Sequence, residues 1–383
     1  MARILLMSRD PGGANVIIPL VRPLRARGHE ALLFGKDFAL EKYARAGLEA
    51  IDIRDRVGDV TQESITRLVA AVRPDMICTA TSADDFSERF LWKAAGIFGV
   101  YSIAILDQWI NYGIRFSDFP VSEIGLYLAR PSHPYLPSKI LVMDETARTE
   151  AIAAGLDSAR LVVTGQPHFE SVLKTMDSIE PRELEGIRAH FGVEHGDRLV
   201  TFASEPISDT YGSEEAGREF WGYSERTVFA ALLRSVAEIA ERHSMRVGIV
   251  IRLHPKEDAG YFENLMVTQS GKRTYLRIDR EIDAVKLMKA SDLVCGMSSM
   301  FLIEAAVANV PVISVQIGLK RENPFVLDRS GAIPSVLETS SLQRELERYL
   351  VRHEQPRYGL GQSRDAVRNI VMEMEGSLCR NSQ

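Results

Sequence analysis

Short apolar runs alternate along this chain with segments that repeat their apolar residues at helical spacing. In the first part we expect strands at Ile4–Ser8, Glu30–Phe34, Ala50–Ile53, Met76–Thr79, Ser102–Leu106, Lys139–Met143 and Leu161–Thr164. Between them we expect helices at Asn15–Arg27, Ala39–Gly47, Gln62–Val72 and Ser87–Phe98. Strands that alternate with helices predict a parallel sheet covered by helices on both faces.

The same alternation restarts after a charged stretch, Met176–Asp197. Strands are expected at Leu199–Ala203, Arg246–Arg252, Tyr275–Ile278, Leu293–Cys295 and Val312–Val315. Helices are expected at Ser224–His243, Glu281–Lys289, Ser299–Ala308, Ser340–Arg352 and Ser363–Met374. A chain of 383 residues suits two domains of about 150–200 residues each. Because the charged stretch separates the two alternating patterns, we place a linker near 166–185. The sequence therefore predicts an α/β protein with two Rossmann-like, doubly wound parallel-sheet domains that face a cleft.

Composition and charge exclude several classes of protein. The chain is 45% hydrophobic and 26% charged, as in soluble globular proteins. Its net charge of −6 argues against a broad nucleic-acid-binding face. The three cysteines are far apart and form no metal-binding pattern. Asp10 and Pro11 end the first apolar run too early for a signal peptide, and no run approaches the ~18–20 apolar residues of a membrane span. We expect a cytoplasmic protein without a metal ion or a cofactor.

A glycine–serine turn between a strand and a helix is the strongest candidate for a phosphate-binding site. Gly296 permits a sharp turn after the strand, and Ser298 or Ser299 can cap the helix that follows. The free N–H groups and partial positive charge at a helix start favour an anion. Glu304, further along the helix, could accept the two hydroxyls of a ribose. The alternative is a serine-capped helix in which Glu304 pairs with a neighbouring basic side chain.

Arg252, His254 and Lys256 leave an earlier strand of the same half together. Arg252 and His254 flank Leu253, so both side chains point to one face of an extended strand. A guanidinium, an imidazole and an ammonium can neutralise a leaving diphosphate. The alternative is a surface turn with solvated charges.

A long polar loop follows the strand Leu199–Ala203, starting with Ser204 and Glu205. The loop reaches Gly222-Tyr223. Such long loops at the carboxyl end of a strand often bind ligands. We therefore expect Ser204 and Glu205 to contact a ligand, without a specific role for either.

In the first half, Asp10, Gly12, Gly13 and Asn15 lie in the segment that joins the first strand to the first helix. Paired glycines allow the backbone to approach a ligand closely. The segment is not a Gly-x-Gly-x-x-Gly fingerprint, which disfavours NAD, and it lacks the Lys-Ser/Thr of a phosphate-binding P-loop. The alternative is a tight turn built with convenient glycines.

The fifth expected strand is followed by an unusual group of polar and aromatic residues: Asp107, Trp109, Asn111 and Arg115. Aromatic rings stack on sugars, and amides match hydroxyl patterns. A partly buried carboxylate can act as a general base on an acceptor hydroxyl. Asp107 is the first candidate for this base and Asp10 the second. The alternative roles of Asp107 are a helix cap or an ion pair with Arg115.

Two more residues are candidates for ligand contact in this half. Asp84 follows the fourth expected strand, and His168 lies at the expected hinge within Gly165-Gln-Pro-His-Phe-Glu170. Asp84 is adjacent to Asp85 and does not form the alternating Asp-x-Asp pattern of a metal-dependent transferase.

Together, the two halves and the Val-Thr-Gly165-Gln-Pro junction resemble a GT-B glycosyltransferase. Arg252-Leu-His254-Pro255, Ala290-Ser291-Asp292, Ser298-Ser299 and Val310-Pro311-Val312-Ile313 resemble bacterial CDP-glycerol glycerophosphotransferases and capsule polysaccharide transferases. This resemblance implies that His254, Ser298 and Ser299 contact the diphosphate of a donor.

The chain is also similar to UDP-N-acetylglucosamine 2-epimerases, through Val163-Thr164-Gly165 and Glu304-Ala305-Ala306. It lacks the His-Arg-Arg-Glu-Asn and Thr-Glu-Arg-Pro-Glu segments of that family. Arg321-Glu322-Asn323-Pro324 is only a loose counterpart of the latter. This resemblance is therefore the weaker of the two.

These observations predict a metal-independent transferase of glycan or glycosylated-metabolite biosynthesis. Residues 1–170 would form an acceptor domain and residues 171–383 a nucleotide-donor domain, with the last helix a candidate to cross back to the first domain. The donor would be a UDP, GDP, CDP or TDP conjugate, the acceptor a small molecule or a glycan, and the protein a candidate homodimer. The alternatives are a UDP-sugar 2-epimerase or hydrolase of the same fold and a non-catalytic nucleotide-sugar-binding subunit.

Overall fold

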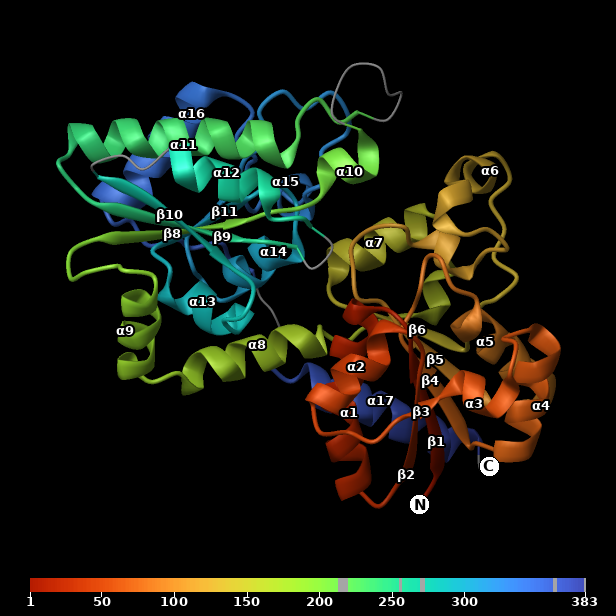
Figure 1. Cartoon of the computed structure of the whole chain (residues 1–383). Helices are drawn as coiled ribbons and strands as arrows, with labels where there is room; N and C mark the ends of the chain where they lie inside the picture. The colour runs from red at the N-terminus through yellow and green to blue at the C-terminus, as the bar shows by residue number, and fades with distance from the viewer. Residues whose placement is uncertain (213–219, 255–256, 269–272, 361–363, 382–383) are drawn as a thin grey trace. The chain divides into compact units, whose positions relative to one another are not determined.

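The protein forms two compact units in a computed structural model that describes residues 1–212, 220–254, 257–268, 273–360 and 364–381. Unit 1 comprises Met1–Ser171 and Gln362–Gln383, and unit 2 comprises Val172–Gly361. Each unit contains one parallel sheet with helices on both faces (Figure 1). The expected α/β class with two doubly wound parallel sheets is confirmed. In the described part of the chain, no helix is both long enough and apolar enough to cross a membrane.

The sheet of unit 1 has seven strands in the order β3-β2-β1-β4-β5-β6-β7. They are β1 (Arg3–Ser8), β2 (Glu30–Gly35), β3 (Ile51–Asp52), β4 (Met76–Thr79), β5 (Tyr101–Ile105), β6 (Lys139–Val142) and β7 (Leu161–Val163). The interior strand β1 pairs Leu6 with Leu33 of β2 on one side and with Cys78 of β4 on the other. The order of the strands reverses between β1 and β4, which is where doubly wound sheets bind ligands at the carboxyl ends of their strands.

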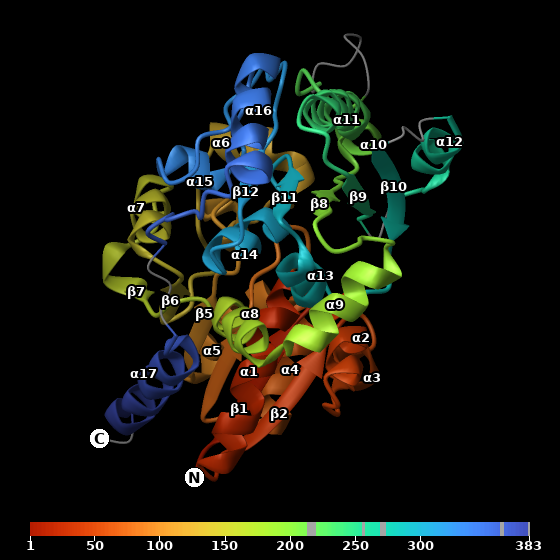
Figure 2. The same cartoon turned by 90° about the vertical axis from the view of Figure 1, so that its left-hand side faces the viewer.

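Helices cover both faces of this sheet. They are α1 (Pro11–Ala26), α2 (Phe38–Arg45), α3 (Ile53–Val57), α4 (Gln62–Val72), α5 (Ser87–Phe98), α6 (Ile124–Ala129), α7 (Glu145–Ala153) and α17 (Ala366–Asn381), with 3-10 turns at Gly113–Phe116, Val121–Glu123 and Ser158–Arg160. One apolar core joins the sheet to α1, α2 and α17, and a second joins its other face to α3, α4 and α5. The last helix, α17, packs beside α1 (Figure 2).

Helix α1 begins at Pro11, four residues earlier than expected, so Gly12 and Gly13 belong to its first turn. Proline suits the start of a helix because its missing N–H would have no partner there. Gly13 is buried, and a Cβ atom on it would lie 2.7 Å from Cβ of Ala80, just after β4. The glycine therefore lets α1 start close to the carboxyl end of β4.

We expect Gly13→Ala to lower the free energy of unfolding of the protein by about 1–3 kcal/mol, the usual cost of overpacking a buried site. Gly96→Ala is a matched control, because Gly96 lies in helix α5 of the same unit with open space around its Cα. That change should be neutral or stabilise by about 0.5–1 kcal/mol, since alanine favours a helix interior. Urea unfolding of the two variants measures the difference, and equal stabilities would contradict the close approach of α1 to β4.

Unit 2 has a five-stranded sheet in the order β10-β9-β8-β11-β12. The strands are β8 (Arg198–Ala203), β9 (Val247–Arg252), β10 (Thr274–Asp279), β11 (Leu293–Gly296) and β12 (Val312–Ser314). Here the order reverses between β8 and β11. The ends of these two strands are therefore the position where unit 2 is expected to bind a ligand.

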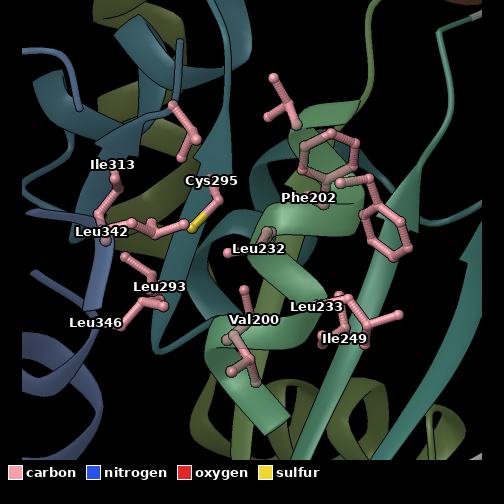
Figure 3. Close-up of a cluster of buried hydrophobic side chains, with 14 of the residues drawn as sticks. Val200, Phe202, Leu232, Leu233, Ile249, Leu293, Cys295, Ile313, Leu342 and Leu346 are labelled. Atoms are coloured by element: carbon pink, nitrogen blue, oxygen red, sulfur yellow. The ribbon is translucent and has the colours of Figure 1, made fainter. Parts of the chain in front are cut away.

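Helices also cover both faces of the second sheet. They are α9 (Pro181–His190), α10 (Ile207–Tyr211), α11 (Glu225–Arg242), α12 (Gly260–Thr268), α13 (Ala284–Ala290), α14 (Met300–Val307), α15 (Val326–Arg329) and α16 (Thr339–Leu346), the last continued by a π-helical segment, Glu347–Val351. Figure 3 shows the larger core, in which Leu232 of α11 and Leu342 of α16 face Phe202, Ile249 and Cys295 of the sheet. Ile187 and Leu287 pack on the opposite face.

The expected linker near 166–185 is largely helical. Helix α8 (Pro167–Ser178) runs through the boundary between the two units, which falls after Ser171. Inside unit 1, the carboxylate of Glu170 accepts a hydrogen bond from the N–H of Val367, 2.8 Å away. The boundary between the units therefore lies inside the range expected for the linker, and the chain crosses it as a helix.

Candidate functional site

The tips of β8 and β11 meet at a glycine in unit 2. Gly296 pairs with Ala203, and a Cβ atom on Gly296 would lie 2.8 Å from the carbonyl oxygen of Ala203. Only glycine fits there without a shift of the backbone. The close approach places Ser204 and Glu205, which follow β8, next to the turn that leads from β11 into α14.

The carboxylate of Glu205 occupies the start of α14. Its Oε2 accepts a hydrogen bond of 2.7 Å from the N–H of Ser298, and its Oε1 accepts one of 3.1 Å from the Ser298 hydroxyl. Burial raises the pKa of Glu205 to about 7, although N–H groups of Met297, Ser298 and Ser299 favour the ionised form. We call these three N–H groups the α14 mouth. The mouth binds an anionic group of the protein itself, at the position where the sequence predicts a phosphate.

Ser299 stands at the N-cap position of α14, but its hydroxyl does not cap the helix. The oxygen of this hydroxyl is buried and has no hydrogen-bond partner among the residues that the structure describes. Buried polar atoms normally have partners. The side-chain cap expected from Ser299 is therefore absent.

The guanidinium of Arg252 lies between the tips of β9 and β10. It forms an ion pair with Asp279 and donates a hydrogen bond of 2.8 Å to the carbonyl of Ile282. Arg252 therefore braces the sheet, and its contact with a diphosphate stays a prediction. Lys256 lies outside the described residues.

Ser204 and His254 share one carboxylate, that of Glu257. The Ser204 hydroxyl donates a hydrogen bond of 2.6 Å to Oε1 of Glu257, and the backbone N–H of His254 donates one of 3.0 Å to Oε2. Burial raises the pKa of Glu257. This bridge orients the ends of β8 and β9 beside one another. Glu304 is half-buried on α14, and its expected role toward a ribose stays a prediction.

Asp107 is the most deeply buried acid among the candidate residues of unit 1. Its side chain is 4% exposed, and burial raises its pKa. Nη1 of Arg115, 3.4 Å from Oδ1, and the nearby His168 oppose this shift, whereas the charge of Asp10 adds to it. A Cβ atom on Gly12 would lie 2.1 Å from Oδ2 of Asp107. The structure thus brings these five expected site residues together at the start of α1.

The expected ion pair between Asp107 and Arg115 is present, but Asp107 is not the main partner of the Arg115 guanidinium. Nη1 of Arg115 donates to the carbonyl and the hydroxyl of Thr81 at 3.0 and 2.9 Å. Its Nε is buried and has no partner in the described ranges. Arg115 therefore holds the loop after β4 near the loop after β5. It compensates the negative charge of the Asp107 carboxylate only in part.

Trp109 is a core residue and not an open platform for a sugar. It is 4% exposed, its ring stacks on Phe169 with centroids 5.7 Å apart, and its Nε1 donates to the carboxylate of Asp144. The sequence prediction failed because these partners lie 35 or more residues away. Asn111 is half-buried with a φ of 58°, a conformation that asparagine tolerates better than most residues.

The remaining candidates of unit 1 lie around this edge of the sheet. Asp84 is exposed on the loop after β4. Asn15 lies on α1, where its side-chain oxygen accepts a hydrogen bond of 2.7 Å from Lys42. Asp10 accepts a hydrogen bond of 3.0 Å from Arg9. Their contacts with a ligand stay predictions.

Sequence reasoning missed two polar residues near this edge. Glu88, in the first turn of α5, is 1% exposed, and neither carboxylate oxygen has a partner among the described residues. Burial, together with the charge of Asp85, raises its pKa well above the ordinary value. Gln166 donates a hydrogen bond of 3.2 Å to the carbonyl of Asp107. A carboxylate on the apolar side of an amphipathic helix was the only signal for Glu88.

Comparisons with known proteins identify the fold. No family model and no curated protein sequence matches the chain. Among solved structures, UDP-GlcNAc 2-epimerase from Methanocaldococcus jannaschii matches with a TM-score of 0.65 at 13% identity, covering 97% of this chain and 99% of that one. A glycosyltransferase from Rickettsia africae matches with a TM-score of 0.60 at 11% identity, covering 99% of both chains. HepE from Anabaena, in complex with UDP and glucose, matches with a TM-score of 0.57 at 15% identity, covering 98% and 100%. The chain has the GT-B fold.

Proposed function

We propose that this protein is a GT-B glycosyltransferase that moves a sugar from a nucleotide-activated donor to an acceptor hydroxyl in glycan or glycosylated-metabolite synthesis. In this proposal unit 2 binds the donor. The α14 mouth and the Ser299 hydroxyl hold the diphosphate, His254 contributes to its charge balance, and Glu304 accepts the ribose hydroxyls. Unit 1 binds the acceptor, and Asp107 removes the proton of its hydroxyl.

One observation carries the donor assignment: an anionic group already lies in the α14 mouth. The Glu205 carboxylate accepts the N–H and the hydroxyl of Ser298, while the buried Ser299 hydroxyl beside it has no partner among the described residues. A diphosphate offers more acceptor oxygens than a carboxylate and can use all these donors. The GT-B fold of HepE, described in complex with UDP and glucose, supports the same assignment.

Isothermal titration with UDP-glucose, and with the corresponding CDP, GDP and TDP sugars, tests the proposal and selects the base. CDP conjugates are included because the motifs of unit 2 resemble CDP-glycerol glycerophosphotransferases. Absence of binding by all of them would refute the donor assignment.

For the conjugate that binds, we expect Ser299→Ala to weaken affinity about tenfold, because a hydrogen bond to a charged group contributes about 1.5 kcal/mol or more. Ser330→Ala is the control: its hydroxyl donates to the carbonyl of Leu327 in the same unit, and its loss should leave affinity unchanged. An unaltered affinity in Ser299→Ala would remove this hydroxyl from the site.

The second candidate function is epimerisation or hydrolysis of a UDP sugar. It is favoured by the likeness in fold to UDP-GlcNAc 2-epimerases. Incubation with UDP-GlcNAc and no acceptor distinguishes the two, because only an epimerase or hydrolase would convert the sugar. NMR of the mixture would reveal the C2 epimer or the free sugar. A protein that binds a nucleotide sugar and shows no turnover with any acceptor would instead be a binding subunit.

A further inference from the structure

A hollow of about 610 Å³ lies at the edge of the sheet in unit 1, away from the switch point between β1 and β4. Its volume falls within the range of about 300–1,000 Å³ that is typical of small-molecule sites. It is bounded by β2, β3, α3 and α4, which lie together at one side of the sheet (Figure 1). None of the residues proposed for the transferase lines it.

The hollow exists because β3 is short. Strands β2 and β3 pair only through Phe34 with Ile51 and through Gly35 with Asp52. Within the described ranges, the first four residues of β2 therefore have no strand beside them on this edge. Apolar side chains from both strands and from α3 and α4 form the walls: Leu32, Phe34, Ile51, Val57, Leu68, Ala71 and Val72.

Among the polar side chains of the lining, only two arginines can bind a ligand. The Ser64 hydroxyl already donates to the carbonyl of Asp59 at 2.6 Å. Arg56 is exposed, and the described residues provide no ion pair for it. Arg67 contacts Glu63, but both side chains are more than 70% exposed, and such solvated pairs are weak. The site thus combines an apolar interior with two guanidinium groups.

We propose that this hollow binds a single-chain amphiphile with an anionic head, of the fatty-acid or alkyl-phosphate class. The alkyl chain lies against the apolar walls, where each buried CH₂ contributes about 0.8 kcal/mol. The carboxylate or phosphate accepts hydrogen bonds from Arg56 and Arg67, whose forked donors suit these anions. A neutral lining would not distinguish an anionic head from a cationic one, and an acidic lining would favour the cationic head.

Titration with decyl phosphate, below the concentration at which it forms micelles, tests this proposal. The wild-type protein should bind one molecule, and decyltrimethylammonium should bind at least tenfold more weakly. Ala71→Trp fills the hollow and should weaken binding of decyl phosphate at least tenfold. Ala70→Trp is the matched control: Ala70 is exposed on the same helix and does not line the hollow, so it should retain wild-type affinity. Thermal unfolding verifies that both variants fold.

Arg56→Gln combined with Arg67→Gln should also weaken decyl phosphate binding about tenfold, whereas Arg45→Gln, an exposed change on α2, should not. Equal binding by the two tryptophan variants would overturn the proposal. Equal affinity for the phosphate and the ammonium amphiphile would also overturn it. Dissociation of a dimer by Ala71→Trp in sedimentation experiments would assign the hollow to a second copy of the chain, which contradicts an amphiphile site.

Discussion

Asp107→Asn should reduce turnover of the nucleotide sugar by about 10²–10⁴-fold, the usual contribution of a general base, and should leave donor affinity unchanged. Asparagine has nearly the shape of aspartate, so the fit against Gly12 is preserved, but an amide cannot accept the proton of an acceptor hydroxyl. The raised pKa of Asp107, caused by burial, makes its carboxylate a stronger base than an exposed one. Steady-state kinetics and donor titration of the variant separate catalysis from binding.

The pH dependence follows from the sign of this shift. A base must be deprotonated, so kcat/KM should fall as the pH drops through the raised pKa of Asp107. Asp118→Asn removes an exposed acid of the same loop region and should retain both the wild-type rate and the wild-type profile. If Asp10→Asn lost more activity than Asp107→Asn, Asp10 would be the base. Full activity in both variants would exclude these carboxylates from the reaction.

The alternation of apolar runs and helices was sufficient to predict both sheets. Helices α4 and α5 begin and end at the predicted residues, because their apolar faces repeat at regular spacing and their neighbours are strands of the same local unit. Local contacts decide where these elements start and stop. The strand expected at Ala50–Ile53 is shorter because the Asp52 side chain accepts the N–H of Arg54 and starts helix α3.

Features that depend on distant partners could not be predicted. The ring of Trp109 is buried by Phe169 and Asp144, which belong to later elements. The strand–turn–helix at Gly296 predicted an anion site, because glycine and serine constrain the backbone locally. That Glu205 would fill the α14 mouth depends on the order of the sheet, which brings residues 93 positions apart into contact. Local chemistry predicted free N–H groups at this turn, and the topology determined that the Glu205 carboxylate accepts them.

Affinity for UDP-glucose should fall about 30-fold between pH 6 and pH 8.5. The Glu205 side chain is anchored at the end of β8, so a diphosphate in the α14 mouth would leave the carboxyl group beside two negative charges and without its N–H donors. It must then be neutral, and binding takes up a proton. With a pKa of about 7 in the free protein, the competent fraction falls about tenfold per pH unit above this value. UDP-glucose keeps its charge throughout this range.

Glu205→Gln should bind UDP-glucose with an affinity that is nearly independent of pH and, at pH 8.5, about 30-fold tighter than that of the wild type. The amide preserves the size of the side chain and removes the titrating group. Asp209→Asn is the control for a simple loss of negative charge, because Asp209 is exposed near the same loop; it should keep the wild-type pH slope. Calorimetric titrations between pH 6 and pH 8.5 measure the affinity of each variant and its dependence on pH.

Affinity that rises with pH in the wild-type protein would mean that the Glu205 carboxylate moves into water when the ligand binds. A loss of binding in Glu205→Gln would instead make Glu205 a direct contact of the ligand, and either result contradicts competition for the α14 mouth.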